Sequence, residues 1–309
     1  MRAVVCTAYG PPEVLQLQEV PTPTPKGNEV RVAIRTTTAH VGDTRVRGFR
    51  VPTLAWVPAR LALGLTRPRN SILGMELAGT VDAVGEDVTT FKVGDEVVGF
   101  TGFRFGAYAE YCCFAEGGKP SKVGILAAKP SNVSFEDAPC AAGGGLTALL
   151  VLEKANIRPG QRVLIYGASG SVGTFAVQLA RHFGATVTGV CSSANVQLVR
   201  SLGAEHVIDY TREDYAQSGV VYDVIFDAVS KTSKSHARSC LAPSGTYLDV
   251  DKASNDISVT AEAFEFLLGL MDEGVVRSVI DRRYPLAEIV DAHRYVDQGH
   301  KKGNVVITV

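Results

Sequence analysis

The sequence predicts an α/β protein built in two parts, a partly closed β-barrel followed by a doubly wound parallel sheet. Two observations predict this fold class. Short β-branched or aromatic runs separated by Gly and Pro turns fill the first third, and from about Pro139 apolar strands alternate with helical segments. The length of 309 residues fits two domains, since a domain typically has about 100–200 residues.

The barrel is predicted from runs whose residues suit a pleated surface. Turn signals such as Pro25-Lys26-Gly27 and Val93-Gly94-Asp95 separate these runs. The predicted strands are Val30–Ile34, Ala78–Val84, Glu96–Phe100 and Ala107–Phe114.

The parallel sheet is predicted from apolar runs with helical segments between them, which is the pattern of strands joined by crossover helices. The expected helices include Val172–Phe183 and Asn195–Leu202. The expected strands are Arg162–Tyr166, Thr186–Val190, His206–Ile208, Val224–Phe226 and Gly245–Asp249.

The last part of the chain has its own pattern. Ala261–Glu273 places apolar residues at helical spacing, and Asn304–Val309 is again strand-like. Because the segment after Gly274 contains no complete strand–helix–strand unit, we expect it to return to the first domain. The predicted boundaries are 1–124 for the first domain, 125–270 for the second and 271–309 for the returning segment.

Composition argues against several classes of protein. Hydrophobic residues make up 46% and charged residues 20%, close to globular averages, so disorder is not expected. A net charge of -1 without any basic block argues against a nucleic-acid partner. The six cysteines lack CxxC spacing, and the N-terminal residues enter a strand without a leader pattern, so we expect a cytoplasmic protein.

Leu54–Leu65 is the most membrane-like stretch of the sequence. It is too short to span a bilayer and is interrupted by Pro58 and Arg60. We therefore expect no integral membrane association. We interpret the stretch as a loop or short helix at the rim of a pocket, with a membrane-surface contact as the less favoured alternative.

The strongest chemical signal is a glycine turn between a predicted strand and a predicted helix. Gly170 lets the backbone approach a pyrophosphate, Gly173 lets the helix pack on the strand, and the helix N-terminal amides face the negative charge. Ala168 stands in the first glycine position of G-x-G-x-x-G, so the turn is a variant of that pattern. We predict a dinucleotide site that includes Ala168, Ser169, Gly170, Ser171, Val172 and Gly173.

The loop after the second strand of this sheet predicts the choice of dinucleotide. Cys191–Asn195 contains no acid to bind the free ribose hydroxyls of NAD, and Ser192, Ser193 and Asn195 can donate hydrogen bonds to a 2′-phosphate. We therefore expect NADPH, although the loop carries no Arg or Lys. Tyr210 either closes over the adenosine phosphate or is a surface turn residue.

Further motifs occur in order along nearly the whole chain. They are Gly74-Met75-Glu76-Leu77-Ala78-Gly79, Val93-Gly94-Asp95-Glu96-Val97, Gly106-Ala107-Tyr108-Ala109-Glu110, Gly145-Leu146-Thr147-Ala148-Leu149, Leu202-Gly203-Ala204 and Lys302-Gly303-Asn304-Val305-Val306. With the glycine turn, they resemble the quinone oxidoreductase-like branch of the medium-chain dehydrogenase/reductase family. The resemblance implies a GroES-like β-barrel catalytic domain, a Rossmann domain that binds NADP and a returning C-terminal segment. It also implies that Thr147, Asp227, Val229 and Lys302 lie near the cofactor.

The sequence departs from the zinc-dependent members of this family. The residues at the three zinc-ligand positions are His40, Met75 and Gly143, which cannot form the three-ligand site that catalytic zinc needs. Gly42 occupies the place of the hydroxyl residue that relays the alcohol proton. We therefore predict a metal-free enzyme that reduces a quinone or an α,β-unsaturated carbonyl compound, whose conjugated carbonyl spreads the charge.

The sequence leaves the identity of the proton donor open. His40, Asp43 and Arg45 are our candidates, and Tyr9 or a water molecule are competitors. For Asp43 and Glu76, a structural role is at least as well supported as a catalytic role. In the structural role, backbone amides of the barrel donate hydrogen bonds to the carboxylate. The alternative functions are an enoyl-thioester reductase and a non-catalytic NADPH-binding protein.

The segment after the fifth strand predicts the state of assembly. Six residues, Val250–Asn255, separate that strand from Asp256–Thr260, which is too few for a crossover of at least about 10–12 residues. We therefore expect a short or displaced edge strand, and a monomer or weak dimer.

Overall fold

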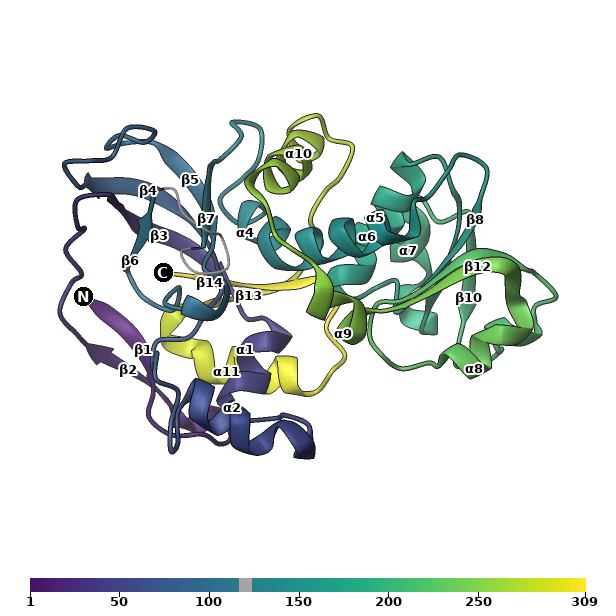
Figure 1. The fold of residues 1–309 in the computed structure, drawn as a ribbon, viewed down its shortest axis with the longest axis horizontal. Helices are drawn as coiled ribbons and strands as arrows, with labels where there is room; N and C mark the ends of the chain where they lie inside the picture. The colour runs from purple at the N-terminus through teal and green to yellow at the C-terminus, as the bar shows by residue number, and fades with distance from the viewer. Residues whose placement is uncertain (117–123) are drawn as a thin grey trace. The chain divides into compact units, whose positions relative to one another are not determined.

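Two β-sheets organise the chain, one in each of two units. The structure is a computed structural model that describes residues 1–116 and 124–309. Unit 1 comprises Met1–Gly143 and Ile280–Val309, and unit 2 comprises Gly144–Val279 (Figure 1).

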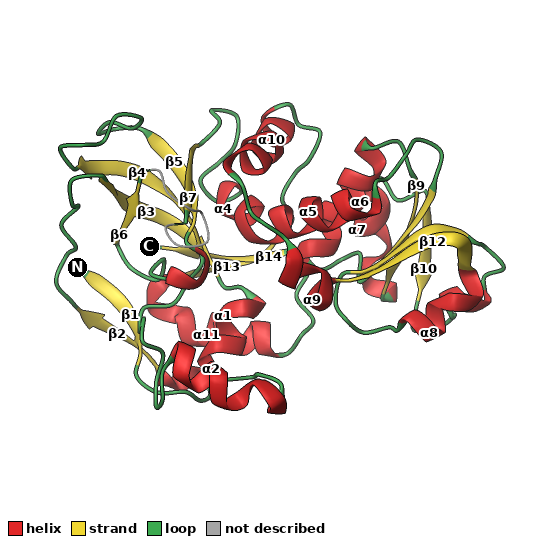
Figure 2. Ribbon diagram, viewed as in Figure 1, coloured by secondary structure: helices red, strands yellow, loops and turns green. Residues whose placement is uncertain are grey.

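Unit 1 is built on a seven-stranded sheet in the order β13-β14-β3-β4-β5-β7, with β6 pairing with β3. All its pairs are antiparallel except β13 with β14 (Figure 2). The strands are β3 (Glu29–Thr38), β4 (Glu76–Val84), β5 (Glu96–Phe100), β6 (Tyr111–Ala115), β7 (Ile125–Ala128), β13 (Ile280–Pro285) and β14 (Asn304–Thr308). A separate antiparallel pair joins β1 (Arg2–Cys6) to β2 (Leu15–Glu19). The α-helices are α1 (Val41–Arg47), α2 (Trp56–Leu63), α4 (Ala138–Cys140) and α11 (Ile289–Asp297).

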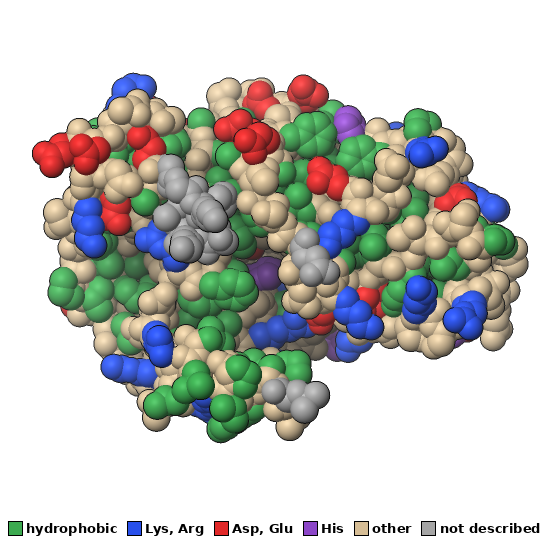
Figure 3. Space-filling model, viewed as in Figure 1, with side chains coloured by type: hydrophobic (Ala, Val, Ile, Leu, Met, Phe, Trp, Pro, Cys, Tyr) green, Lys and Arg blue, Asp and Glu red, His purple; other side chains and the backbone are tan. Residues whose placement is uncertain are grey.

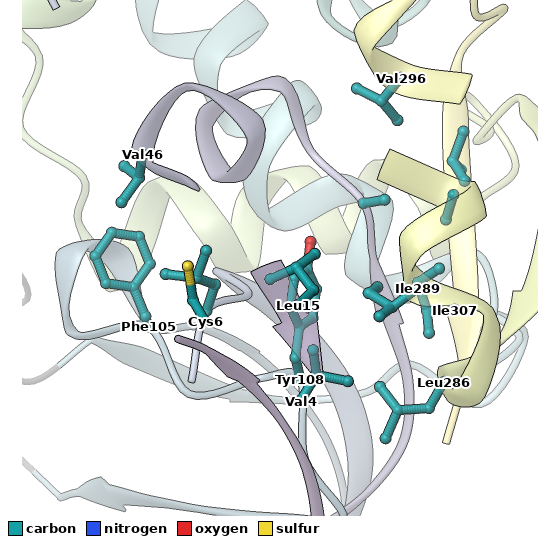
Figure 4. Packing of buried hydrophobic residues seen from close by; sticks show 14 residues of the cluster. Val4, Cys6, Leu15, Val46, Phe105, Tyr108, Leu286, Ile289, Val296 and Ile307 are labelled. Atoms are coloured by element: carbon teal, nitrogen blue, oxygen red, sulfur yellow. The ribbon is translucent and has the colours of Figure 1, made fainter. Parts of the chain in front are cut away.

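A buried hydrophobic cluster fixes the C-terminal helix of unit 1 to the N-terminal strands. Val4 and Cys6 of β1 and Tyr108 lie in the same cluster as Ile289 and Val296 of α11 (Figure 4). Removing such apolar surface from water stabilises the unit by about 25 cal/mol per Å². Segments from the two ends of the chain therefore share one core.

Unit 2 is a five-stranded, fully parallel sheet in the order β10-β9-β8-β11-β12. Its strands are β8 (Arg162–Tyr166), β9 (Thr186–Cys191), β10 (His206–Asp209), β11 (Tyr222–Asp227) and β12 (Leu241–Asp249). Its α-helices are α5 (Leu146–Ala155), α6 (Ser171–His182), α7 (Val196–Ser201), α8 (Lys234–Ala237), α9 (Val250–Ala253) and α10 (Ala261–Asp272). The strand order reverses between β8 and β11, and ligands of such sheets bind at the carboxyl ends of the strands beside this point.

The fold class predicted from the sequence is confirmed, and two predicted strands, Glu96–Phe100 and Arg162–Tyr166, have the observed bounds. One strand is shorter than predicted, because residues 107–110 turn to β1: the carbonyl of Tyr108 accepts from Val4 N (2.8 Å), and Ala109 forms an isolated bridge with Ala3. β13 was not predicted, since its side chains are exposed or half-buried and show no apolar alternation.

The boundaries between the units lie later in the chain than the predicted 124/125 and 270/271. β7 pairs with β5, which keeps the chain up to Gly143 in unit 1. After α10, the backbone N–H and carbonyl of Arg277 bond to the Gln178 side chain of α6 (both 2.9 Å), which holds this segment in unit 2. The returning segment therefore starts at Ile280, and its β14 pairs with β3.

β12 forms one edge of the parallel sheet. Between it and α10, the described chain forms α9 and a 3-10 turn at Ser254–Asp256, and residues 257–260 are not in a strand. The monomer or weak dimer expected from this edge stays a prediction. Across residues 1–116 and 124–309, every helix is too short or too polar to cross a lipid bilayer.

Candidate functional site

The glycine turn of unit 2 connects β8 to α6. The backbone N–H groups of Gly167 and Ala168 both donate to the carbonyl of Val190 on β9 (3.0 Å each), and Gly170 N donates to Gly167 O (3.0 Å). Gly167 has a φ of +77°, which favours glycine. These bonds hold the turn at the carboxyl ends of β8 and β9.

The two later glycines of the turn have different roles. A Cβ at Gly173 would lie 2.1 Å from the carbonyl oxygen of Gly167, so only glycine lets α6 pack this close. A Cβ at Gly170 would meet nothing nearer than 3.4 Å. No side chain caps the N-terminus of α6 at Gly170, so its first N–H groups are available to an anion. Within this turn, Ser171 is buried and Ser169 and Val172 are half-buried.

The loop after β9 is tied to this turn by Asn195. Its side-chain N–H₂ donates to the hydroxyls of Ser169 (3.1 Å) and Ser192 (3.2 Å). Its carbonyl oxygen Oδ1 is buried and has no hydrogen-bond partner among the described residues. A buried acceptor without a donor is costly, and a ribose hydroxyl would satisfy it. The residues present therefore fit a dinucleotide.

The loop after β11 lies against the glycine turn. A Cβ at Gly167 would lie 2.6 Å from Cγ1 of Val229. The two carboxylate oxygens of Asp227 accept from the N–H groups of Val229 (3.1 Å) and Thr232 (2.7 Å). Asp227 therefore shapes this loop through its carboxylate, and Val229 is the residue of the pair that reaches the turn.

Thr147 lies half-buried in the first turn of α5, which packs on α6. Just before this helix, a Cβ at Gly144 would lie 2.3 Å from the hydroxyl oxygen of Ser171. The start of α5 is therefore close to the glycine turn within unit 2.

A pocket of about 630 Å³ opens beside the carboxyl ends of these strands. It carries three basic side chains, those of Arg212, Lys231 and His236, which the sequence analysis did not associate with the cofactor. Its full lining is Tyr166, Tyr210, Thr211, Arg212, Glu213, Asp214, Tyr215, Lys231, Thr232, Ser233 and His236. Arg212 and Lys231 lie on the loops after β10 and β11, and His236 lies on α8, so the short loop after β9 gave no sign of them.

Ser193 joins this pocket to the loop after β9. Its hydroxyl donates to Asp209 and lies 3.1 Å from that of Thr211, which lines the pocket. Hydrogen bonds from Ser193 and Thr211 hold the pKa of Asp209 below its ordinary value. Tyr210 is 52% exposed, with its ring centroid 6.5 Å from that of Tyr166. The acids that line this pocket are Glu213 and Asp214, and Asp214 lies 2.9 Å from Nε2 of His236. Asp209 accepts from Ser193 and Thr211, so a nucleotide's phosphate would meet Arg212, Lys231 and hydroxyl groups beside these acids.

Unit 1 contains a buried polar cluster at the start of α1. His40 caps this helix: its Nδ1 accepts from Gly42 N (3.0 Å), and its own backbone N–H donates to the Asp43 carboxylate (3.2 Å). With Nδ1 accepting, the proton of the neutral imidazole is on Nε2. Burial, with the positive charges of Lys301 and Arg45, lowers the pKa of His40 to about 4. His40 is therefore neutral near pH 7 and able to donate a hydrogen bond, but it is not suited to give up a proton.

Asp43 is fully buried and its oxygens are occupied. They accept from Gly74 N (3.2 Å) and from the hydroxyl of Tyr108 (3.0 Å) as well as from His40 N. Burial raises the pKa of Asp43 to about 7, against the lowering effect of these bonds. The contacts support the structural role of Asp43 that the sequence left open.

Tyr108 is held in turn by two buried basic residues. Arg47 always donates, so Nδ1 of His293 accepts from it (3.1 Å) and Nε2 of His293 donates to the Tyr108 hydroxyl (3.0 Å). Arg47 also pairs with Asp297 at 2.6 Å. This chain of bonds fixes the Asp43 carboxyl from the side of α11.

Glu76 is the buried acid with unused bonding capacity. Its Oε2 accepts from the hydroxyl of Thr38, whereas its Oε1 has no partner among the described residues. Burial and the nearby Asp43 charge raise the pKa of Glu76 to about 8. A Cβ at Gly143 would lie 1.6 Å from Oε1, so the Glu76 carboxyl fills the space that a side chain at position 143 would need.

Lys301 is a functional candidate that the sequence analysis missed. Its ammonium donates to the carbonyl of Gly303 (2.6 Å), and burial lowers its pKa to about 8, against the raising effect of Glu76. The charge of Lys301 also acts on His40, so the three groups lie near one another. Both Lys301 and Lys302 precede β14, and no alternation in the sequence distinguishes the half-buried lysine from the exposed one.

The remaining predicted residues lie outside this cluster or at its edge. Arg45 is exposed on α1, although its charge acts on His40. Lys302 is exposed, and its backbone N–H donates to Asp281 (2.8 Å). The Tyr9 hydroxyl donates to Gly64 O (3.1 Å), which places Tyr9 beside α2.

Two of the three positions predicted to correspond to zinc ligands, His40 and Met75, lie close together in unit 1 without forming a ligand set. A Cβ at Gly42 would lie 2.9 Å from Nδ1 of His40 and 3.3 Å from the sulfur of Met75. One imidazole and a thioether are a poor donor set for Zn²⁺. No group of three or more His, Cys, Asp or Glu side chains that could hold a metal occurs in the described part of the chain.

Comparisons with known proteins agree with this architecture. Residues 26–121 match the alcohol dehydrogenase GroES-like domain family, and residues 202–307 match the zinc-binding dehydrogenase family. The chain is 32% identical to a quinone oxidoreductase of Pseudomonas aeruginosa, with 97% of each chain covered. It is 28% identical to an NADPH-dependent alkenal/one oxidoreductase of Arabidopsis thaliana, covering 99% of this chain and 79% of that protein.

A solved structure shows the same likeness over the whole length. The quinone oxidoreductase from Coxiella burnetii superposes with a TM-score of 0.87 at 29% identity, covering 100% of this chain and 99% of that one. The recognition made from the motifs is confirmed. The chain belongs to the quinone oxidoreductase-like branch of the medium-chain dehydrogenase/reductase family.

Proposed function

We propose that the chain reduces quinones and α,β-unsaturated carbonyl compounds with NADPH. The observation that carries the proposal is the polar cluster of unit 1, where the charge of a cationic Lys301 acts on a neutral His40 and where Met75 and Gly143 fill the other two metal-ligand positions. Hydrogen bonds and a proton, rather than a Lewis acid, would then stabilise the charge that develops on the substrate oxygen. Relatives named as quinone and alkenal/one oxidoreductases support these substrate classes.

NADPH rather than NADH is favoured by the charges around the ribose loop. The loop Ser192–Asn195 carries no acid, and Arg212 and Lys231 line the adjoining pocket. A 2′-phosphate would gain charge-assisted hydrogen bonds from these cations. Tyr210, at the mouth of the same pocket, would cover the adenosine. When bound, the dinucleotide supplies the hydride.

The chain's own groups supply the proton and the hydrogen bonds. We assign to Nε2 of His40 a hydrogen bond to the substrate oxygen as negative charge develops there. Lys301, whose pKa of about 8 keeps most of it charged at pH 7, would then give one N–H proton to the reduced product and regain it from water. This assignment adds Lys301 to His40 and leaves Asp43 a positioning role.

We also expect a cytoplasmic location. All six cysteines are unpaired thiols, and burial raises the pKa of Cys6, Cys112, Cys113 and Cys191, which suits thiols kept reduced.

The test is NADPH oxidation with a panel of acceptors. We expect turnover with 1,4-benzoquinone, 9,10-phenanthrenequinone or a 2-alkenal. An enoyl thioester serves as the comparison, because preference for it would favour enoyl-thioester reduction. NADPH binding without turnover of any acceptor would contradict the proposal and favour a non-catalytic binding protein.

A further inference from the structure

The segment around α2 has a surface unlike the rest of unit 1. Four large apolar side chains are exposed on it, namely Trp56 (48%), Val57 (62%), Leu61 (61%) and Leu65 (68%). We call these four residues the apolar patch. Val57 and Leu61 are four residues apart and therefore share one face of the helix. Figure 3 shows hydrophobic side chains gathered over α2 at the lower edge of the view, with basic side chains beside them.

The charges of this segment have one sign. From Thr44 to Met75 the sequence has no Asp or Glu and contains six arginines, at positions 45, 47, 50, 60, 67 and 69. The whole protein has a net charge of -1, so this excess is local, and Asp297 offsets part of it by pairing with Arg47 (2.6 Å) and Arg50 (3.1 Å). Arg67 and Arg69 are exposed immediately after the apolar patch.

Arginine contacts hold the patch in its exposed form. The Arg60 guanidinium lies over the rings of Phe49 (4.0 Å), Tyr9 (4.6 Å) and Trp56 (4.8 Å), and it donates to the carbonyl of Leu65. Arg69 donates to the carbonyl of Leu61 (2.7 Å). Such cation–π contacts stabilise each pair by about 0.5–2 kcal/mol. The apolar side chains therefore face solvent because their neighbours are fixed, not because the segment is loose.

We propose that the apolar patch docks on an anionic phospholipid surface. An amphipathic segment with Trp and Leu on one side and arginines beside them lies in the interface of a bilayer, with apolar groups among the acyl chains and cations at the headgroups. At eight residues, α2 is about 12 Å long and rests on the surface rather than crossing it. A second copy of the chain fits less well, because a two-fold axis through the patch would bring the two sets of arginines together. The proposal does not depend on the reaction that the protein performs.

Trp56 makes a direct test possible, because it is the single tryptophan of the sequence. With vesicles containing about one third phosphatidylglycerol, we expect its emission to shift to the blue, brominated acyl chains to quench it and the protein to co-sediment. With phosphatidylcholine alone, or in high salt, binding should fall by about tenfold or more. Equal binding to both vesicles, or emission that does not move with either, would overturn the proposal.

Two variants and one control locate the contact. Leu61→Ser with Leu65→Ser keeps Trp56 as the reporter and should weaken vesicle binding by about tenfold or more. Arg67→Gln should weaken binding to the anionic vesicles by about fivefold. Val93→Ser changes an apolar residue that is 60% exposed on the turn between β4 and β5, and it should bind as the parent does. A dimer that the Leu61→Ser, Leu65→Ser variant dissociates, without vesicle binding by the parent, would instead assign the patch to a second copy.

Discussion

The two units bury their charges differently. In unit 1, Asp43 and Glu76 are fully buried and His40 and Lys301 are half-buried, and burial moves the pKa of each toward the neutral form. In unit 2, Asp209 and Asp214 lie beside the pocket and accept hydrogen bonds. The effect of these bonds on the pKa exceeds that of burial, so both pKa values are lowered. Charges that stay fixed suit the binding of an anionic cofactor, and groups that titrate near pH 7 suit proton transfer.

The largest effect should come from Lys301, the half-buried lysine of unit 1. Lys301→Gln is expected to lower kcat by about a hundredfold, because a general acid contributes at least that much. In the parent, kcat should fall as pH rises through about 8, where the ammonium loses its proton, and the variant should lose this limb of the profile. The exposed neighbour gives the control: Lys302→Gln should keep both the rate and the profile. An unchanged profile in Lys301→Gln would remove this lysine from the mechanism.

In unit 2, two glycine variants separate binding from folding. Gly173→Ala forces a Cβ to within 2.1 Å of a carbonyl oxygen and should lower the free energy of unfolding by about 1–3 kcal/mol. The methyl group of Gly170→Ala meets no protein atom nearer than 3.4 Å, so Tm should stay the same. The Kd for NADPH should rise by about tenfold, because the methyl group would obstruct the pyrophosphate. Calorimetry and NADPH titration measure the two quantities. Parent-like NADPH binding by Gly170→Ala would contradict the placement of the pyrophosphate.

The fixed charges of unit 2 predict the choice of cofactor. Arg212→Gln should raise the KM for NADPH by about tenfold and leave that for NADH nearly unchanged, because only the former has a 2′-phosphate. Ser192→Asp should shift preference toward NADH by adding the missing carboxylate. Arg200→Gln, an exposed arginine of α7, is the matched control. Parent kcat/KM that is equal or better with NADH would contradict the preference for NADPH.

Glu76 should make stability depend on pH in a defined window. Its pKa in the folded protein, about 8, exceeds the ordinary 4.5, so the folded state keeps a proton that the unfolded chain releases. The free energy of unfolding should therefore fall as pH rises from about 4.5 to 8 and level off above. Asp43 and Lys301 also change protonation between pH 7 and 8, so the contribution of Glu76 is the difference between the parent and Glu76→Gln in urea unfolding at these two pH values. Glu76→Gln should remove a fall on the order of 1 kcal/mol, and the exposed Glu86→Gln should retain it.

The smallest expected effect is that of a chelator. With His40, Met75 and Gly143 at the ligand positions, activity should be the same before and after treatment with EDTA, and elemental analysis should find no stoichiometric zinc. One tightly bound equivalent of zinc, with activity lost on its removal, would contradict this prediction and favour alcohol oxidation.

Sequence reasoning predicted unit 2 better than unit 1, for a physical reason. The glycine turn depends on residues next to one another in the chain, so its strand and helix could be inferred from spacing alone. The polar cluster of unit 1 is assembled from Thr38–Asp43, Glu76 and Lys301, segments that only the β3, β4 and β14 pairings bring together. The basic pocket of unit 2 was missed for the same reason, since Arg212 and Lys231 lie on separate loops.

The contact between Gly143 and Glu76 limits the order in which mutations can convert the metal-free site into a zinc site. A sulfur ligand for zinc cannot be restored at position 143 by one substitution, because its Cβ would lie 1.6 Å from a buried carboxylate oxygen. Glu76 would have to shrink or turn away first, and that change alone would leave Thr38 without its acceptor and Lys301 without its nearby acid. A mutational path from this chain to a zinc enzyme therefore has to pass through a weakened intermediate. An engineered metal site should begin at position 76 and end at position 143.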